Sequence, residues 1–216
     1  MIKEGLYFRS EGNEASRYWL LLMGFLVVSY AVYELVQGSA EVDKELIAAK
    51  QMIEENKELT AGKQKSVEGS EKGEEEADLL PDFQMEVGDN AGVIEIDSVK
   101  IEAPIISGTD EGSLRKGVGH MPSTKLPGQN DQILLAGHRD TVFEPLEGIE
   151  EDDLIKITMP YGTYEYRVIG TDVVKGTDTS IIQSRNKEEL VLVTCYPFQL
   201  FGAASDRFIV YAVPII

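Results

Sequence analysis

The chain has 216 residues, of which 43% are hydrophobic, and this is enough for one sizeable packed domain with a further segment. Its 38 acidic residues outnumber 20 basic ones and give a net charge of −18, which excludes the basic surface that nucleic-acid binding requires. A single cysteine and two histidines exclude an intramolecular disulfide and a cysteine-rich zinc site.

The first predicted elements are a short cytoplasmic N-terminus over residues 1–17 and a transmembrane signal anchor over 18–37. Residues 18–33 form an uncharged, largely apolar run. At about 1.5 Å per residue this run reaches roughly 24 Å, and its flanking residues extend it toward the roughly 30 Å of a hydrocarbon core. Arg17 before the run and Glu34 after it predict an N-terminus inside the cell.

Two alternatives to an anchor remain open. The run is only slightly too long for a cleaved signal peptide, and Gly38-Ser39-Ala40 offers small residues where cleavage would occur. A buried core helix is the other alternative, because the run is short for a membrane span. The anchor and the signal peptide both predict that the rest of the chain is extracytoplasmic, and the anchor predicts a single-pass protein of the cell membrane in contact with lipid.

Residues 38–91 are predicted to be a stalk and an acidic linker. A helix is expected over 41–59, where Val42, Leu46, Ala49 and Ile53 share one stripe. A stalk is favoured over a dimerising coiled coil because the pattern covers fewer than three heptads. Residues 60–82 lose all periodicity and are rich in acidic side chains, which indicates a flexible tether.

Residues 92–216 predict a mostly β fold: a closed or nearly closed barrel of seven to eight strands with short helices. Short segments of β-branched and alternating residues recur between turn-forming residues. The expected strands are Val93–Ile96, Val99–Ile106, Gln132–His138, Leu154–Thr158, Thr163–Val174, Leu190–Cys195 and Arg207–Val213, with one helical turn at Gly112–Lys116.

Three residues at strand ends are candidates for catalysis. Cys195 ends an apolar strand, where a lone cysteine is either an inert core residue or a nucleophile at the barrel rim. His138 ends another strand after Gly137 and could serve as its base, although a structural histidine is the common alternative. Arg207 begins the last strand, and antiparallel pairing with the cysteine strand would bring its guanidinium beside the thiol to hold an oxyanion.

Two rivals for these roles come from the same segments. Arg139 follows His138 directly, so its side chain is expected on the opposite face of the strand. His120 is the second candidate base, but it lies between glycine-rich turns and follows no apolar strand. His138 is therefore the favoured base.

These segments resemble the sortase family. Leu192-Val193-Thr194-Cys195 is similar to the sortase signature around the cysteine, Leu135-Ala136-Gly137-His138-Arg139 to that around the histidine, and Asp206-Arg207-Phe208 to that around the arginine. The resemblance covers about residues 92–216, and the anchor and linker match the usual layout. Gly119-His120-Met121-Pro122 and Gly137-His138-Arg139-Asp140-Thr141 look most like class D sortases of Gram-positive bacteria.

The resemblance implies a cysteine transpeptidase of the cell wall. Cys195 would form a thioester after Thr in an LPXTG-like sorting motif, with an LPNTA-like motif expected for class D. His138 would act as general acid and base, and Arg207 would stabilise the oxyanion. The acceptor would be an amine of a peptidoglycan cross-bridge or precursor. His120 and the neighbours of the cysteine, Thr194 and Tyr196, are the candidate substrate-binding residues.

No cofactor is expected, and calcium is possible but not favoured. An acidic stretch after the histidine strand supplies the carboxylates that calcium prefers, but a charge run is more often a solvated face. It comprises Glu144, Glu147, Glu150, Glu151, Asp152 and Asp153. Two other functions compete: an L,D-transpeptidase, whose Ser-x-Gly-Cys setting Val193-Thr194-Cys195 does not match, and a non-enzymatic wall-binding module with a core cysteine.

Overall fold

The first element is one long helix, α1 (Asn13–Gln64), in a computed structural model that describes residues 13–64, 85–199, 202 and 204–215. The chain divides into one unit up to Ala40 and a second unit from Glu41 onward. The helix predicted over 41–59 lies within α1, which continues to Gln64 although the apolar pattern stops earlier. The remainder of the tether predicted over 60–82 lies outside the described residues.

The apolar run of residues 18–33 also lies within α1. Its large side chains are exposed, with 72% for Phe25 and 71% for Leu20. Among the residues that the structure describes, no helix is both long and apolar enough to cross a membrane. The transmembrane anchor predicted over 18–37 is therefore not found there, and the side chains of residues 34–37 are not among those described.

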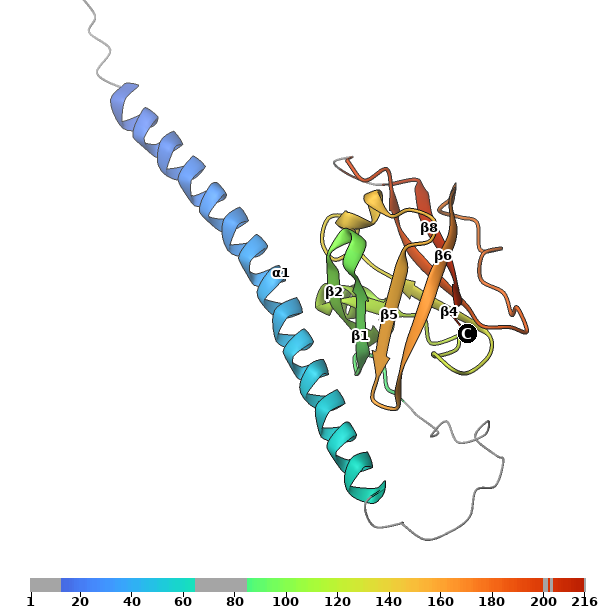
Figure 1. Ribbon diagram of the computed structural model, residues 1–216. Coiled ribbons are helices and arrows are strands. Elements are labelled where there is room, and N and C mark those ends of the chain that lie inside the picture. The colour runs from blue at the N-terminus through green and yellow to red at the C-terminus, as the bar shows by residue number, and fades with distance from the viewer. Residues whose placement is uncertain (1–12, 65–84, 200–201, 203, 216) are drawn as a thin grey trace, which may run out of the picture. The chain divides into compact units, whose positions relative to one another are not determined.

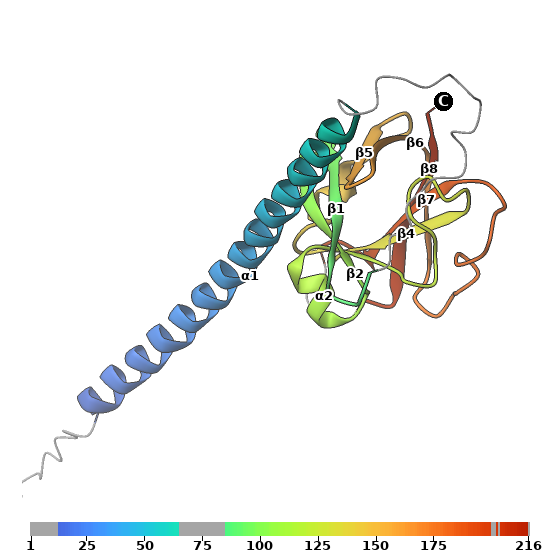
Figure 2. The ribbon, with the colours of Figure 1, turned by 90° about the horizontal axis from the view of Figure 1, so that it is seen from below.

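Eight strands form a closed barrel in the order β1-β2-β3-β4-β7-β8-β6-β5. Figure 1 shows the strands wrapped around one another, and in Figure 2 the labels from β1 through β5, β6, β8, β7 and β4 follow one another around the ring. The strands are β1 (Asn90–Ile96), β2 (Ile101–Ser107), β3 (Val118–His120), β4 (Gln132–Ala136), β5 (Leu154–Met159), β6 (Gly162–Lys175), β7 (Glu189–Tyr196) and β8 (Asp206–Pro214).

The closed barrel predicted from the sequence is confirmed, with local differences. β3 was not predicted, because a strand of three residues leaves almost no alternation to detect. The predicted start of the second strand at Val99 is wrong: a 3₁₀ turn over Asp97–Val99 ends at Lys100, whose φ of 58° lies in the left-handed region. The short helix α2 (Glu111–Lys116) is capped by Asp110, which accepts from two backbone amides.

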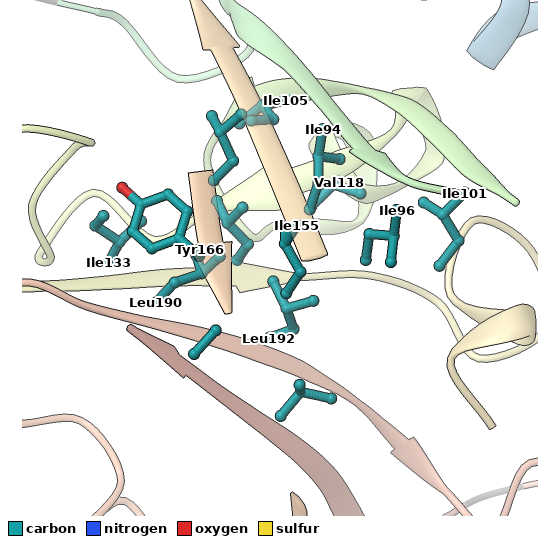
Figure 3. Close-up of a cluster of buried hydrophobic side chains, with 14 of the residues drawn as sticks. Ile94, Ile96, Ile101, Ile105, Val118, Ile133, Ile155, Tyr166, Leu190 and Leu192 are labelled. Atoms are coloured by element: carbon teal, nitrogen blue, oxygen red, sulfur yellow. The ribbon is translucent and has the colours of Figure 1, made fainter. Parts of the chain in front are cut away.

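Alternation along the strands separates an inner face from an outer face. On β7, Leu190 and Leu192 belong to the central core together with Ile133 and Leu135 of β4. Figure 3 shows Tyr166 of β6 among these aliphatic side chains, with its ring inside the barrel. Because side chains on a strand point alternately to opposite faces, the odd-numbered residues of β7 lie outside the barrel. Cys195 therefore faces outward from the last part of this strand.

Candidate active site

Cys195 and Arg207 lie directly opposite each other in the antiparallel pairing of β7 and β8. Residues opposed in this way have Cβ atoms about 4.5–5.5 Å apart on the same face of the sheet. The Cys195 thiol is free and half-buried. The guanidinium of Arg207 donates to the carbonyls of Asp206, at 3.0 Å, and Ala204, at 3.4 Å. Both partners are uncharged carbonyl groups, so these hydrogen bonds leave the positive charge of Arg207 unneutralised.

His138 follows the end of β4, the parallel neighbour of β7 on its other side. The two strands pair Ala136 with Val193, and Gly137 N donates to Val193 O at 3.1 Å beyond the end of β4. His138 is the next residue, so it follows the strand that lies beside the cysteine strand. The structure thus places Cys195 opposite Arg207, with His138 just beyond the end of the strand on the other side of β7.

Local packing fixes the chain at His138. A Cβ at Gly137 would lie 2.6 Å from Cδ2 of Phe143, so only glycine fits beneath this buried ring. Phe143 reaches that place because the chain turns back after His138, whose carbonyl accepts from Phe143 N at 3.1 Å. The close neighbour of Gly137 is thus an aromatic side chain.

Two further charged side chains lie next to this site. The Glu111 carboxylate of α2 lies 4.0 Å from Nε2 of His138 and is 76% exposed. The Arg139 guanidinium donates to Pro197 O at 2.7 Å and to Gly202 O at 2.5 Å. Arg139 thus ties two residues that lie between Cys195 and Arg207 to the histidine segment. The sequence gives no sign of the contacts of His138 with Glu111 or of Arg139 with Pro197 and Gly202, because these contacts join segments that are distant in the chain.

His120 lies inside the barrel and away from the outer face that carries Cys195. It is opposite Leu135 in the pairing of β3 with β4, and only 3% of it is exposed. Its Nε2 donates to Lys125 O at 2.9 Å, while Nδ1 has no hydrogen-bond partner among the described residues. Burial lowers the pKa of this imidazole, so the neutral ring is favoured. The structure leaves no exposed surface on His120 for a substrate to touch.

Thr194 and Tyr196, the neighbours of the cysteine, face the inner side of β7. The Thr194 hydroxyl is buried and donates to Gly137 O at 2.8 Å, which ties the histidine segment to the cysteine strand. Tyr196 stacks on Phe208 with ring centroids 6.5 Å apart and meets Phe198 edge-on. Both side chains lie on the inner face of β7, opposite to the outer face that carries the thiol.

An apolar cluster on the outer face was missed by sequence reasoning. It consists of Ile181, Val191 and Ile209, which are 9%, 0% and 0% exposed and are called the outer patch here. Val191 and Ile209 come from β7 and β8, and Ile181 comes from the loop over 176–188 that joins β6 to β7. The patch could not be recognised in advance, because strand periodicity does not tell which loop covers a given face.

The acidic stretch after His138 forms local contacts. Asp153 accepts from Glu150 N at 2.9 Å, and Asp152 pairs with Arg167 at 3.4 Å. Within the described part of the chain, no three acidic, histidine or cysteine side chains are grouped as a metal would require.

A closed barrel that carries a free thiol opposite a guanidinium, with an imidazole just beyond the adjacent strand, points to a β-barrel cysteine enzyme. Comparison with known protein families identifies the enzyme: the sortase domain matches residues 94–215 of this chain. Sortase D of Bacillus subtilis (strain 168) is 35% identical over 194 residues, which cover 89% of this chain and 94% of the relative. The chain belongs to the sortase family and is a class D-like sortase, a cysteine transpeptidase.

Solved structures show the same fold. A sortase D5 transpeptidase of Clostridium perfringens superposes with a TM-score of 0.62 at 23% identity, covering 82% of this chain and 99% of that one. Sortase C of C. perfringens SM101 gives a TM-score of 0.56 at 26% identity, covering 87% and 99%. The family assignment removes the two competing functions, an L,D-transpeptidase and a non-enzymatic wall-binding module.

Proposed function

We propose that this sortase cleaves an LPXTG-like sorting motif after its Thr and joins the surface protein to an amine of the cell wall. The observation that carries the proposal is the pairing of Cys195 with Arg207, with His138 just beyond the end of the neighbouring strand β4. A nucleophile, a group that transfers protons and a fixed cation are the three parts that acyl transfer through a thioester needs.

In the first half-reaction the Cys195 thiol gives its proton to His138, and the sulfur attacks the carbonyl carbon of the motif's Thr. Arg207 donates hydrogen bonds to the oxyanion that forms, where a preorganised charge costs no rearrangement. The bond from Thr to the next residue breaks, the leaving amine takes the proton from His138, and a thioester remains on Cys195. In the second half-reaction the incoming amine attacks the thioester and gives its proton to His138, which returns it to the departing Cys195 sulfur and so restores the thiol.

A mass spectrum of the protein incubated with peptides tests this function. The panel contains LPXTG-type and LPNTA-type peptides, with and without an acceptor such as triglycine or a diaminopimelate-containing peptide. We expect cleavage after Thr, a covalent adduct on Cys195, and a joined product when the amine is present, with LPNTA preferred as class D membership suggests. Cleavage elsewhere, or no adduct with any peptide, would contradict the proposal.

We also propose that the apolar run of residues 18–33 anchors the enzyme in the cell membrane, with its N-terminus inside and the barrel outside. Exposed apolar side chains along this part of α1, and Arg17 before it, support the placement. Protease added to intact protoplasts should cut between residues 60 and 90 and release the barrel. Full protection of the barrel would contradict this placement.

A further inference from the structure

Three aromatic side chains, called the aromatic cluster below, meet where β7 ends and β8 begins. Tyr196 is the last residue of β7, Phe198 follows this strand, and Phe208 lies near the start of β8. The ring centroids of Phe198 and Phe208 are 5.3 Å apart, those of Tyr196 and Phe198 6.2 Å, and those of Tyr196 and Phe208 6.5 Å. All three distances lie in the range of favourable aromatic pairs, so each ring supports the other two.

The aromatic cluster lies behind the pair formed by Cys195 and Arg207, called the catalytic rung below. These two residues are opposite each other in the pairing of β7 with β8, and Tyr196 and Phe208 directly follow them in the chain. Because side chains alternate between the faces of a strand, Tyr196 and Phe208 are diagonal neighbours on the inner face, one on each side of the catalytic rung. Aromatic side chains are long enough for such a diagonal contact, and the two rings are stacked.

The catalytic rung lies close to the end of the ladder between the two strands. One further pair, Tyr196 with Asp206, follows it, and the pairing of β7 with β8 ends there. Pairs at the end of a ladder open more readily than pairs in the middle, because fewer neighbours hold them closed. Phe198 and Phe208 also pack against the central core, so the aromatic cluster ties this end of the ladder to the barrel interior.

We propose that the three residues of the aromatic cluster are positioning residues, which hold the thiol and the guanidinium of the catalytic rung in register. An oxyanion that forms at the thiol then lies within reach of its donor without prior rearrangement. This inference rests on the proposed function. Tyr196 and Phe208 lie on the face opposite to the thiol, so they act through the two strands and not by contact with the substrate. Loss of a ring should therefore slow acyl transfer and leave binding of the motif unchanged.

The experiment measures kcat and KM on an LPNTA-type peptide for the wild type, Phe208→Leu and Tyr196→Leu. The same two changes are also made in an Arg207→Lys background. Leucine keeps an apolar side chain at each position but removes the ring. The combined variants complete a double-mutant cycle, which shows whether the aromatic cluster acts through Arg207. Hydrogen exchange at the amides of residues 196 and 206 reports directly on the last pair of the ladder.

Tyr164→Leu is the matched control. The Tyr164 ring meets that of Tyr161 edge-on at 6.0 Å, so this change also removes one aromatic contact from the barrel. Tyr164 lies in the part of β6 that pairs with β5, whereas Arg207 is opposite Val174 near the other end of β6. The control variant should unfold at a lower urea concentration but keep the wild-type kcat and KM and the wild-type exchange at residues 196 and 206.

For Phe208→Leu and Tyr196→Leu we expect kcat to fall about three- to tenfold, the size expected for the loss of one aromatic pair, with KM within about twofold. In the Arg207→Lys background the same changes should lower kcat by less than about twofold, because the donor that the aromatic cluster positions has already been removed. Exchange at residues 196 and 206 should become faster in both ring variants, since the end of the ladder opens more often.

Three results on the peptide would overturn the inference. Wild-type kcat in both ring variants would show that the aromatic cluster does not position the catalytic rung. An equal loss of kcat in the wild-type and Arg207→Lys backgrounds would show that the rings do not act through Arg207. A higher KM at unchanged kcat would show that they contact the substrate. If the wild type cleaves no peptide, the proposed function fails, and exchange decides on the aromatic cluster: wild-type rates at residues 196 and 206 in Phe208→Leu would overturn its role.

Discussion

The ring of Phe143 occupies the place where a side chain at residue 137 would project, with 2.6 Å between Cδ2 and a Cβ built on Gly137. The residue directly before the candidate base is thus fixed by an aromatic side chain that returns from the following turn. Because Phe143 is fully buried, it has little room to move away. Packing at this position and placement of His138 are consequently linked.

Gly137→Ala should therefore destabilise the protein by about 1–3 kcal/mol and reduce peptide cleavage, since an added methyl must displace a buried ring. Urea unfolding and the rate of peptide cleavage measure the two effects. Gly148→Ala is the matched control, because a Cβ there would meet its nearest neighbour, Val99, at 3.7 Å. Equal stability of the two variants would contradict the linkage.

Arg207→Lys should lower the turnover of peptide by about 10²–10³, the usual cost of removing one oxyanion donor. Lysine keeps the charge but not the planar fork, so it cannot hold two carbonyls and still face an oxyanion. Cys195→Ala should abolish both cleavage and transfer, because the chain has no other thiol. Arg167→Lys, on a surface pair, is the control and should keep wild-type turnover. If Arg207→Lys lowers turnover only slightly, another donor must stabilise the oxyanion.

Protonation of His120 should lower the stability of the folded protein in mild acid. Burial lowers its folded pKa below the unfolded value near 6.5, so the unfolded chain binds the proton first. The contribution of neutral His120 to the free energy of unfolding is then fully present above about pH 6.5. It falls as the pH decreases toward the folded pKa, by at most about 1.4 kcal/mol per pH unit. Urea unfolding between pH 5 and 7.5 should show this slope, and His120→Gln should remove it. The same slope in both proteins would assign it to other groups.

Arg139→Lys should loosen the segment between Cys195 and Arg207. One guanidinium bonds two carbonyls, those of Pro197 and Gly202, and an ammonium on a single stem cannot reproduce this fork. Faster hydrogen exchange at Phe198 and Gly202 and a lower kcat are expected, with exchange elsewhere in the barrel unchanged. Exchange at wild-type rates in that segment would show that the two bonds do not order it.

Removal of divalent cations should leave activity within about twofold of its starting value. The 176–188 loop is tied to the base of β4 by direct hydrogen bonds from Asp131 and Gln132, so no ion is needed to join the two segments. Peptide cleavage measured with EDTA, and again after calcium is added, checks this. A loss with EDTA that calcium reverses would contradict it.

The sequence predicted the barrel and its three catalytic candidates because their signals are local. Alternation identified seven strands, and family motifs at strand ends gave Cys195, His138 and Arg207 as candidates, whose roles stay a prediction. The interior place of His120 was not predicted, because its pairing with Leu135 depends on a strand too short to recognise. The contacts of Arg139, Asp131 and Gln132 were also missed, since hydrogen bonds to loop backbones depend on which distant segments approach.

The position of β7 between two partner strands limits how the enzyme can recognise a peptide. Its backbone groups are already bonded to β4 on one side and to β8 on the other. A peptide lying over the thiol therefore has no free edge there to join as an added strand, so main-chain pairing cannot supply its affinity. Discrimination must come from the side chains that protrude from the outer face. A short motif with few, widely spaced determinants suits a surface of this kind.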